Sequence, residues 1–169
     1  MQNSNWVLAA HECPGFEKFS PGPHLEKNGY AHHTEYLSIK VEKRYGFLNI
    51  TNLANEVVKR SKIIDGFCFV STMHITAGIF VNDAESGLLE DIGKWIEKLA
   101  PFQPQYLHHL TGEDNADAHL KSYLTNHFIQ VPISNSKLDL GQWQQIFYAE
   151  FDGLRSKKVV IKSTGMTTQ

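Results

Sequence analysis

The chain has 169 residues, of which 41% are hydrophobic and 20% are charged, and its net charge is −2. This length is typical of one domain, and the composition is that of a globular protein rather than a disordered chain. The near-neutral charge argues against nucleic acid or a membrane as partner, and no apolar run approaches the roughly 20 residues of a membrane span. Because the start lacks signal-peptide features and the two cysteines are too few for a disulfide framework, we expect a cytoplasmic protein.

The amino-terminal third of the chain combines a poorly patterned segment with clear secondary structure. Residues 1–30 contain three prolines and three glycines without periodicity, which predicts an irregular arm before a single domain at 31–169. The alternating stretch 35–41 predicts a half-buried strand, and 47–50 is expected to pair back on it as a hairpin. A helix is predicted near 53–63 and a turn at Asp65-Gly66.

The middle of the chain carries an amphipathic helix. Two strand-like stretches, 67–73 and 77–81, flank His74 and precede this helix, which is predicted at 86–99. Pro101 ends it. Its apolar residues at helical spacing are expected to face the core: Leu89, Ile92, Ile96 and Leu99.

The remaining pattern predicts a short helix at 115–124 and strands at 128–133, 143–151 and 157–162, with Trp143 in the core. Strands outnumber helices and mostly follow one another as hairpins. This order predicts an α+β fold, a mainly antiparallel β-sheet or sandwich with two to three helices. A Rossmann or Walker-type nucleotide site is excluded because no strand leads into a glycine-rich helix start.

Nine histidines are an unusual number for this length, and imidazole is the commonest metal ligand in proteins. His74, His108 and His119 lie at a break between strands, in a loop and on a short helix. Three such side chains could converge on a tetrahedral ion and leave its fourth position open. The spacing alone does not distinguish them from ordinary surface histidines. The other histidines receive no site: the pair His32-His33 is interpreted as solvated, and His11, His24 and His127 are given no role.

Five stretches, in order along the chain, resemble the YjbQ-like family, which is described as secondary thiamine-phosphate synthases. They are His74–Asp83 (His-Ile-Thr-Ala-Gly-Ile-Phe-Val-Asn-Asp), Tyr106–His108, Glu113–Ser122, Val131–Ile133 with Leu140–Gln144, and Glu150–Arg155. The resemblance covers roughly residues 34–163 and implies a small α+β homotrimer. It also implies a divalent metal ion, zinc, bound by His74, His108 and His119. His109 is the competing choice, but the eleven residues between His108 and His119 match the spacing in the family.

The implied activity joins a pyrimidine pyrophosphate to a thiazole phosphate and releases pyrophosphate, so the expected partner is a small phosphorylated metabolite. Asp83 and Glu150 are expected to orient the ligands or move a proton, which makes them the candidate catalytic residues. The candidate substrate-binding residues supply hydroxyl groups, positive charge, an amide and an aromatic ring: Thr76, Lys121, Ser122, Trp143, Gln144 and Arg155.

Two departures from the family pattern bear on this reading. Asp83 replaces a glutamate, and Lys157-Lys158 stand where paired arginines are usual, which gives up bidentate phosphate binding. The same candidate residues allow two alternative functions: a metal-dependent hydrolase of a small phosphorylated metabolite, and a non-catalytic trimer that binds metal or ligand.

Overall fold

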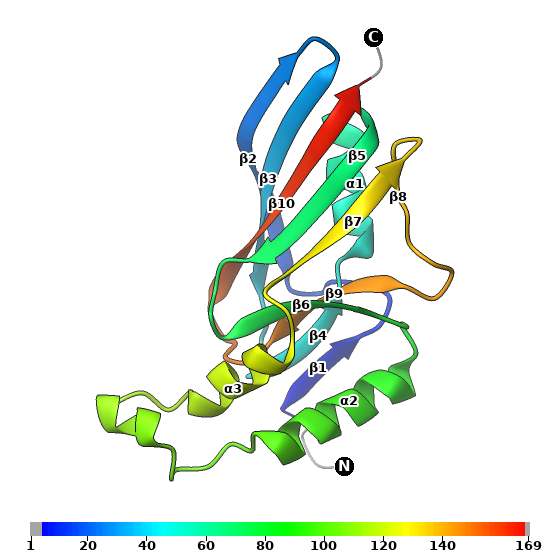
Figure 1. Ribbon diagram of the computed structural model, residues 1–169. Helices are drawn as coiled ribbons and strands as arrows, with labels where there is room; N and C mark the ends of the chain where they lie inside the picture. The colour runs from blue at the N-terminus through cyan, green and yellow to red at the C-terminus, as the bar shows by residue number, and fades with distance from the viewer. Residues whose placement is uncertain (1–4, 168–169) are drawn as a thin grey trace.

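The fold consists of two β-sheets and three α-helices, shown in Figure 1 as a computed structural model that describes residues 5–167. The larger sheet contains, in spatial order, β2 (Phe16–Lys27), β3 (Tyr30–Lys40), β10 (Ser156–Thr167), β5 (Ile63–Thr72), β7 (Phe128–Ser134) and β8 (Lys137–Leu138). All of its strand pairs are antiparallel. The smaller sheet contains β1 (Trp6–Ala9), β4 (Tyr45–Asn49), β9 (Gln145–Glu150) and β6 (Ala77–Asn82). Only its β1–β4 pair is parallel.

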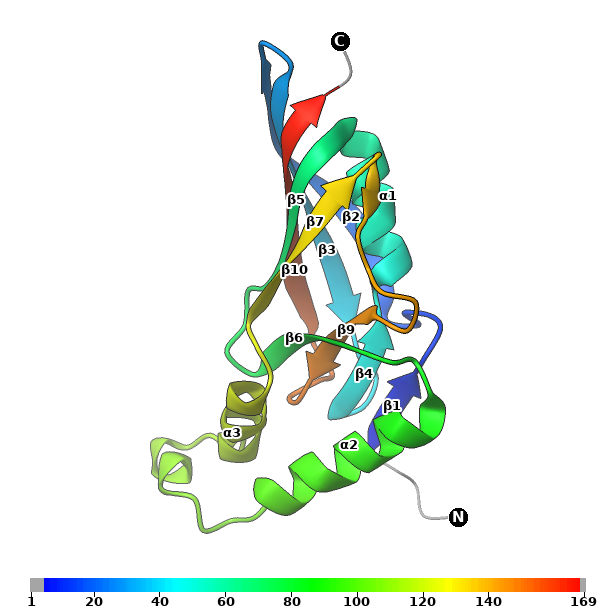
Figure 2. The ribbon, with the colours of Figure 1, turned by 45° about the vertical axis from the view of Figure 1, so that its right-hand side comes forward.

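The helices cover one face of each sheet. They are α1 (Thr51–Ser61), α2 (Ser86–Leu99) and α3 (Ala116–Leu124), with a 3₁₀ helix, η1 (Leu107–Thr111), before α3. In Figure 2, α1 lies along the larger sheet and α2 lies beneath the smaller one. This arrangement confirms the predicted single α+β domain with a mostly antiparallel sheet. Within the described part of the chain, no helix is long and apolar enough to cross a membrane.

Two apolar clusters hold the layers together. The larger cluster joins α1, through Val57 and Val58, to inward-facing residues of the larger sheet such as Leu37 and Val159. The second cluster packs α2 against the smaller sheet and includes Phe147. Along β10 buried residues alternate with exposed or partly exposed ones, as expected for a strand that has one face on the core.

Part of the amino-terminal segment that the sequence predicts to be irregular is regular, because β1 and β2 lie within it. β2 is an edge strand, where a proline without an N–H group is tolerated. Its pairing with β3 shifts register between Pro21 and His24. Asn28 and Gly29 make the turn with φ of 53° and 74°, the geometry that a two-residue hairpin needs.

Two further predictions are wrong: the hairpin of 47–50 with 35–41, and the turn at Asp65-Gly66. The stretch 47–50 does not pair with 35–41: β4 lies between β1 and β9 in the smaller sheet, and all five of its residues are buried. A strand covered on both faces loses the alternation that would reveal its partner. Asp65-Gly66 is not a turn but part of β5, where Gly66 faces Gly165 across the pair.

Burial was overestimated at two helix and strand ends. Leu89 and Ile96 are buried as predicted and Ile92 is partly buried, whereas Leu99 is 53% exposed, although Ile96 and Ala100 on either side of it are buried. Trp143 is 67% exposed, since β9 begins only at Gln145 and the tryptophan lies in the preceding loop.

Candidate functional site

Two of the three candidate metal ligands lie side by side. His108 is on η1 and His119 is on α3, and their ring centroids are 4.9 Å apart with an interplanar angle of 75°. His108 is exposed and His119 is partly exposed, so solvent reaches the pair. The reversal of the chain between η1 and α3, which begins after Gly112 with its φ of 92°, brings the two rings together.

The third candidate, His74, lies in the turn between β5 and β6, which is held against α3. Ser122 Oγ on α3 donates a hydrogen bond to the Ile75 carbonyl at 2.5 Å, and the Thr72 hydroxyl accepts one from the His74 backbone N–H at 3.3 Å. Thr76, at the end of the same turn, accepts from Lys157 Nζ at 2.8 Å. The sequence-predicted Thr76 and Ser122 therefore hold the turn that carries His74.

The electrostatic environment favours neutral imidazoles at this site. Burial lowers the pKa of His74, and the charge of Lys157 lowers it further. Burial also lowers the pKa of His119, and the neighbouring His108 adds to this effect. A neutral imidazole is the form that binds a metal ion, so both shifts suit a ligand.

The donor set fits a metal ion in part. Imidazole nitrogen is a preferred zinc ligand, and His108 and His119 are adjacent. Between residues 5 and 167, however, no three His, Cys, Asp or Glu side chains are arranged to hold one ion. His74 is therefore not placed as a third ligand beside the pair.

His109 is directed away from the pair. Its Nε2 accepts a hydrogen bond from the Ala116 backbone N–H at 3.4 Å, and its ring meets that of Tyr106 edge-on at 5.6 Å. The His109 side chain therefore contacts the first turn of α3.

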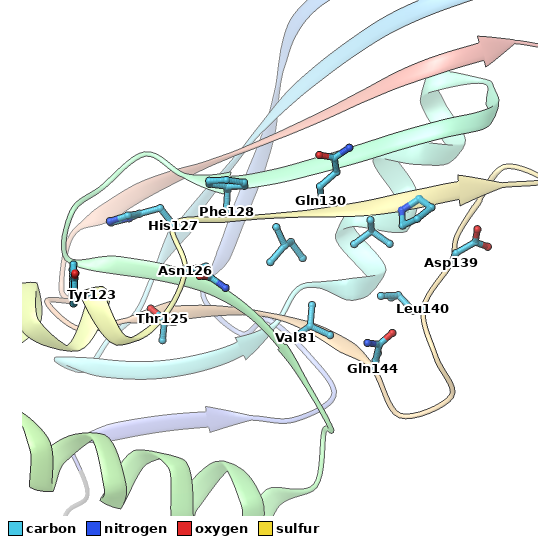
Figure 3. Close-up of a pocket in the computed structure, with 13 residues that line it drawn as sticks. Val81, Tyr123, Thr125, Asn126, His127, Phe128, Gln130, Asp139, Leu140 and Gln144 are labelled. Carbon is cyan, nitrogen blue, oxygen red and sulfur yellow. The ribbon is translucent and has the colours of Figure 1, made fainter.

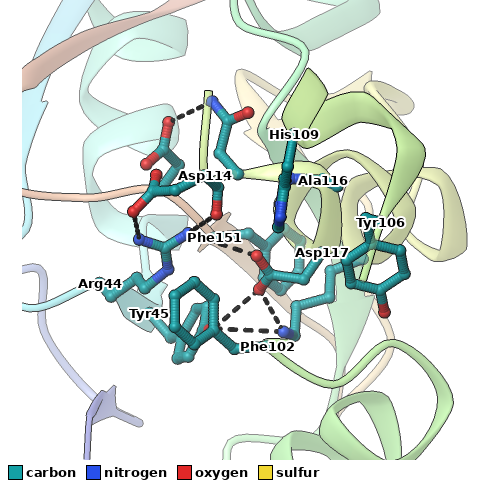
Figure 4. A network of polar contacts seen from close by, with 12 residues as sticks. Arg44, Tyr45, Phe102, Tyr106, His109, Asp114, Ala116, Asp117 and Phe151 are labelled. Atoms are coloured by element: carbon teal, nitrogen blue, oxygen red, sulfur yellow. Dashed lines mark hydrogen bonds and ion pairs between the residues drawn. The ribbon is translucent and has the colours of Figure 1, made fainter. Parts of the chain in front are cut away.

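Lys121 is buried within a polar network rather than facing a substrate (Figure 4). Its Nζ lies 2.6 Å from Asp117 Oδ2, 3.0 Å from Glu97 Oε2 and 3.4 Å from the Tyr45 hydroxyl. The contacts with Asp117 and Tyr45 are hydrogen bonds and the contact with Glu97 is an ion pair, so the predicted direct role in phosphate binding does not match the position of Lys121.

Asp117 is the centre of this network, and the sequence analysis did not single it out. It also accepts from Tyr45 at 2.8 Å and from Arg44 at 3.3 Å. Burial would raise its pKa, but the hydrogen bonds from Lys121 and Tyr45, together with the nearby positive charges, hold the pKa below its usual value. The four-residue spacing of Asp117 and Lys121 on a helix was the one available signal.

Glu150 is fully buried and saturated with donors. Its Oε1 accepts from Lys157 Nζ at 2.5 Å and from the backbone N–H groups of Phe151 and Asp152, and its Oε2 accepts from the Tyr148 hydroxyl at 2.7 Å. A carboxylate with four donors and no solvent contact is suited to holding structure rather than to abstracting a proton.

Arg155 is an exposed cation whose charge acts on His74 and helps to lower the pKa of that imidazole, after burial and Lys157. It contacts Asp152, which also accepts a hydrogen bond from Asn115 at 3.1 Å, just before α3. The side chain of Arg155 is 61% exposed, so its guanidinium group is available to an anion.

The other three predicted residues lie at the opposite end of β6 from His74. Asp83 directly follows this strand, whose six residues span about 20 Å at the usual rise. Asp83 and Trp143 line a surface depression of about 520 Å³. Gln144 borders a separate cavity of about 730 Å³ that Figure 3 shows between β6 and β7. Within one chain these residues are not brought to the histidines.

The comparisons with known proteins agree on one family. The model of the family described as "UPF0047 protein YjbQ-like" matches residues 35–166. A UPF0047 protein from Archaeoglobus fulgidus is 40% identical over 127 residues, which are 75% of this chain and 98% of the relative. The Bacillus subtilis UPF0047 protein YugU is 32% identical over 130 residues, 76% of this chain and 97% of the relative.

Solved structures show the same fold. A Sulfolobus solfataricus protein described as YbjQ-like and of unknown function superposes with a TM-score of 0.76 at 28% identity, covering 80% of this chain and 99% of that one. A hypothetical protein from Aeropyrum pernix gives a TM-score of 0.75 at 32% identity, covering 79% and 98%. The chain therefore belongs to the UPF0047, or YjbQ-like, family.

Proposed function

We propose that the chain is a zinc-dependent enzyme that acts on a small phosphorylated metabolite. The first candidate reaction is the joining of a pyrimidine pyrophosphate to a thiazole phosphate. The observation that supports this proposal is the contact between His108 and His119, whose ring centroids are 4.9 Å apart. Solvent reaches this pair, and α3, which carries His119, also holds the turn of His74. The resemblance to the YjbQ-like family implies the same three ligands.

The proposed reaction places specific demands on the site. The C–O bond between the pyrimidine methylene carbon and the pyrophosphate breaks, a C–N bond to the thiazole nitrogen forms, and pyrophosphate leaves. Zinc, when bound, would supply Lewis acidity toward phosphoryl oxygens. Arg155 is an exposed cation near His74, and its planar guanidinium group suits bidentate binding of a phosphate.

The buried residues take positioning roles in this proposal. Ser122 and Thr76 hold the turn of His74, and Glu150 holds Lys157 against Thr76. Lys121 stabilises α3 from within, through Asp117. The His74 side chain must turn toward the other two histidines to complete the ligand set.

The activity test uses the zinc-loaded full chain with the two thiamine precursors, and it measures thiamine phosphate and pyrophosphate together. We expect both products in equal amounts, and a large loss of turnover in Arg155→Ala. Release of phosphate from a panel of phosphoesters, without thiamine phosphate, would instead support the hydrolase. Absence of both activities in a zinc-loaded sample would contradict an enzymatic role.

The metal test compares three variants by elemental analysis. His108→Ala and His119→Ala should lose most of the zinc at this site. His109→Ala should keep it, because the His109 ring accepts a hydrogen bond from the Ala116 backbone instead. Equal zinc at this site in wild type and His119→Ala would contradict the proposed ligands.

We also propose that the chain forms a homotrimer in the cytoplasm. The resemblance implies the trimer, and the exposed side chains Tyr123 and Phe128, which line the β6–β7 cavity, offer surface for association. Sedimentation equilibrium should give three times the chain mass, and a monomer at micromolar concentration would contradict it. Partly buried Cys13 and buried Cys68 are free thiols, consistent with a reducing compartment, and burial raises the pKa of both to about 12.

A further inference from the structure

A second cluster of histidines lies far from the candidate site, on the β2–β3 hairpin. His24 on β2 and His33 on β3 are direct cross-strand partners. The hairpin projects at one end of the molecule, and α3 lies at the other end in both Figure 1 and Figure 2. Both histidines precede residue 35, where the match to the family model begins. The cluster is therefore independent of the proposed function.

The two rings face each other through the same kind of nitrogen. His24 Nδ1 and His33 Nδ1 are 3.1 Å apart, and the rings are inclined at 68° with centroids 5.2 Å apart. Two imidazole nitrogens bound to one tetrahedral zinc ion, each at 2.0–2.1 Å, are separated by about 3.3 Å. The observed separation is close to this value, so a small adjustment would place both nitrogens on one ion.

The outer nitrogens of both rings face carboxylates. His33 Nε2 lies 2.9 Å from Glu35 Oε1, and His24 Nε2 lies 3.8 Å from Glu26 Oε2. Metal-binding histidines commonly donate their second N–H group to a carboxylate, which fixes the ring and the tautomer. His33 has such a partner within hydrogen-bonding distance, whereas Glu26 lies 3.8 Å from His24 Nε2 and is near it without a hydrogen bond.

The carboxylates are themselves held in place. Glu35 accepts from Arg60 Nε at 2.7 Å and from Arg60 Nη2 at 2.8 Å. Glu26 accepts from the Thr167 hydroxyl at 2.9 Å through its other oxygen. Glu35 Oε1 is thus shared between Arg60 Nε and His33, whereas the Glu26 oxygen nearer His24, Oε2, is not the one bonded to Thr167.

The short contact between the two Nδ1 atoms fixes which ring donates when both rings are neutral. The contact with Glu35 places the N–H of a neutral His33 on Nε2, so its Nδ1 is an acceptor. His24 must then donate from Nδ1, which leaves its Nε2 without a hydrogen toward Glu26 unless the ring is charged. A metal ion that replaces the shared proton lets both rings donate Nε2–H to their carboxylates.

We propose that His24 and His33 form a binding site for a divalent transition-metal ion, with zinc as the reference ion, on the β2–β3 hairpin. Imidazole nitrogen suits zinc, copper and nickel. The side chain of His24 is 44% exposed, which gives the ion access, and that of His33 is 15% exposed. No group of three or more potential ligands is found in the described part of the chain, so water completes the coordination.

The test is zinc titration of the metal-free full chain by calorimetry. His24→Ala and His33→Ala should each lose one zinc equivalent per chain relative to wild type. His119→Ala should keep that equivalent, which separates this site from the one in the proposed function. Glu26→Gln should weaken zinc binding at the hairpin about tenfold, the size expected for the partner of a ligating histidine.

His32 provides the matched control. It neighbours His33, but its Nδ1 lies 2.9 Å from the Thr164 hydroxyl and its ring meets Tyr30 edge-on. His32→Ala should therefore retain full zinc binding. Long-range ¹H–¹⁵N spectra of the histidine-labelled chain should show zinc shifting the His24 and His33 ring nitrogens while those of His32 stay in place.

Two results would overturn the proposal. One is an unchanged zinc equivalent in His24→Ala with a folded hairpin. The other is an equal loss in His32→Ala, which would indicate general binding by surface histidines.

Discussion

Lys157 Nζ lies 2.5 Å from Glu150 Oε1, and this buried ion pair connects the two sheets where the chain passes from β9 to β10. Neither side chain has more than 1% of its surface exposed. Lys157 also reaches Thr76 in the turn of His74. The pair therefore connects the junction of the sheets with the candidate site.

Removing one member of this pair should destabilise the fold strongly. Glu150→Leu leaves the Lys157 ammonium group buried without its counterion, and we expect a loss of about 3–5 kcal/mol in the free energy of unfolding. The double variant Glu150→Leu/Lys157→Met should lose less than the sum of the two single variants. Urea unfolding measures all three.

The exposed pair of Lys94 and Glu90, at 2.9 Å on α2, is the control for the ion pair. Lys94→Ala should change stability little because solvent screens that pair. A Glu150→Leu variant as stable as wild type would contradict the structural role that we assign to Glu150.

The Asp117 network should make stability depend on pH on the acid side. Lys121 and Tyr45 hold the folded-state pKa of Asp117 below that of the unfolded chain, against the effect of burial. The carboxylate therefore contributes stability that is fully present above about pH 4, the usual aspartate value, and is lost as the pH falls through the folded-state pKa. Asp117→Asn should be less stable than wild type at pH 7, and the difference should shrink below pH 4. Urea unfolding between pH 2.5 and pH 7, taken as roughly spanning the window, measures this convergence.

Periodicity predicted the elements that have one buried face, such as α2 and β10. Periodicity failed in β4, a strand that is covered on both faces. Composition failed where the same residue types occur both in turns and in strands. Asp65-Gly66 carries the composition of a turn, but Gly66 is required by a close approach between strands: a Cβ there would lie 2.1 Å from the Thr164 carbonyl oxygen. Such an approach depends on a partner about 100 residues away, which local sequence does not show.

The opposing glycine should be equally intolerant of a side chain. A Cβ on Gly165 would lie 2.1 Å from the Asp65 carbonyl oxygen and 2.7 Å from Gly66 Cα, both of which are backbone atoms. Gly165→Ala must therefore separate β5 from β10, and we expect a loss of about 1–3 kcal/mol by overpacking. Gly29→Ala meets no atom within 4 Å and should lose only the roughly 1 kcal/mol of a left-handed backbone. Thermal unfolding of the two variants should rank Gly165→Ala as the less stable.

The candidate site shows the same limit of sequence reasoning. The order of motifs identified the family and selected His108 over His109, and these two side chains do face different neighbours. Lys121 and Glu150 are candidate site residues by their charge and their place in the motifs, but both are fully buried. Each has a buried ion-pair partner that the sequence reasoning did not assign to it: Asp117 for Lys121, and Lys157 for Glu150. Asp83 was grouped with His74 by motif, although the whole length of β6 separates them.

Zinc occupancy at His108 and His119 should fall on the acid side of neutrality. Protons compete with the metal for the imidazole nitrogens, and the lowered pKa of His119 delays this competition to pH values below the usual histidine value of about 6.5. Zinc content in the His24→Ala background, which removes the hairpin histidine, should stay constant between about pH 7 and 8 and decline below about 6.5. Asp152 raises the pKa of His119, so Asp152→Asn should move the decline to lower pH. Elemental analysis after equilibrium dialysis at each pH measures the curve. Zinc content that is flat down to pH 4, where roughly every accessible imidazole is protonated, would show that the metal is held by other groups.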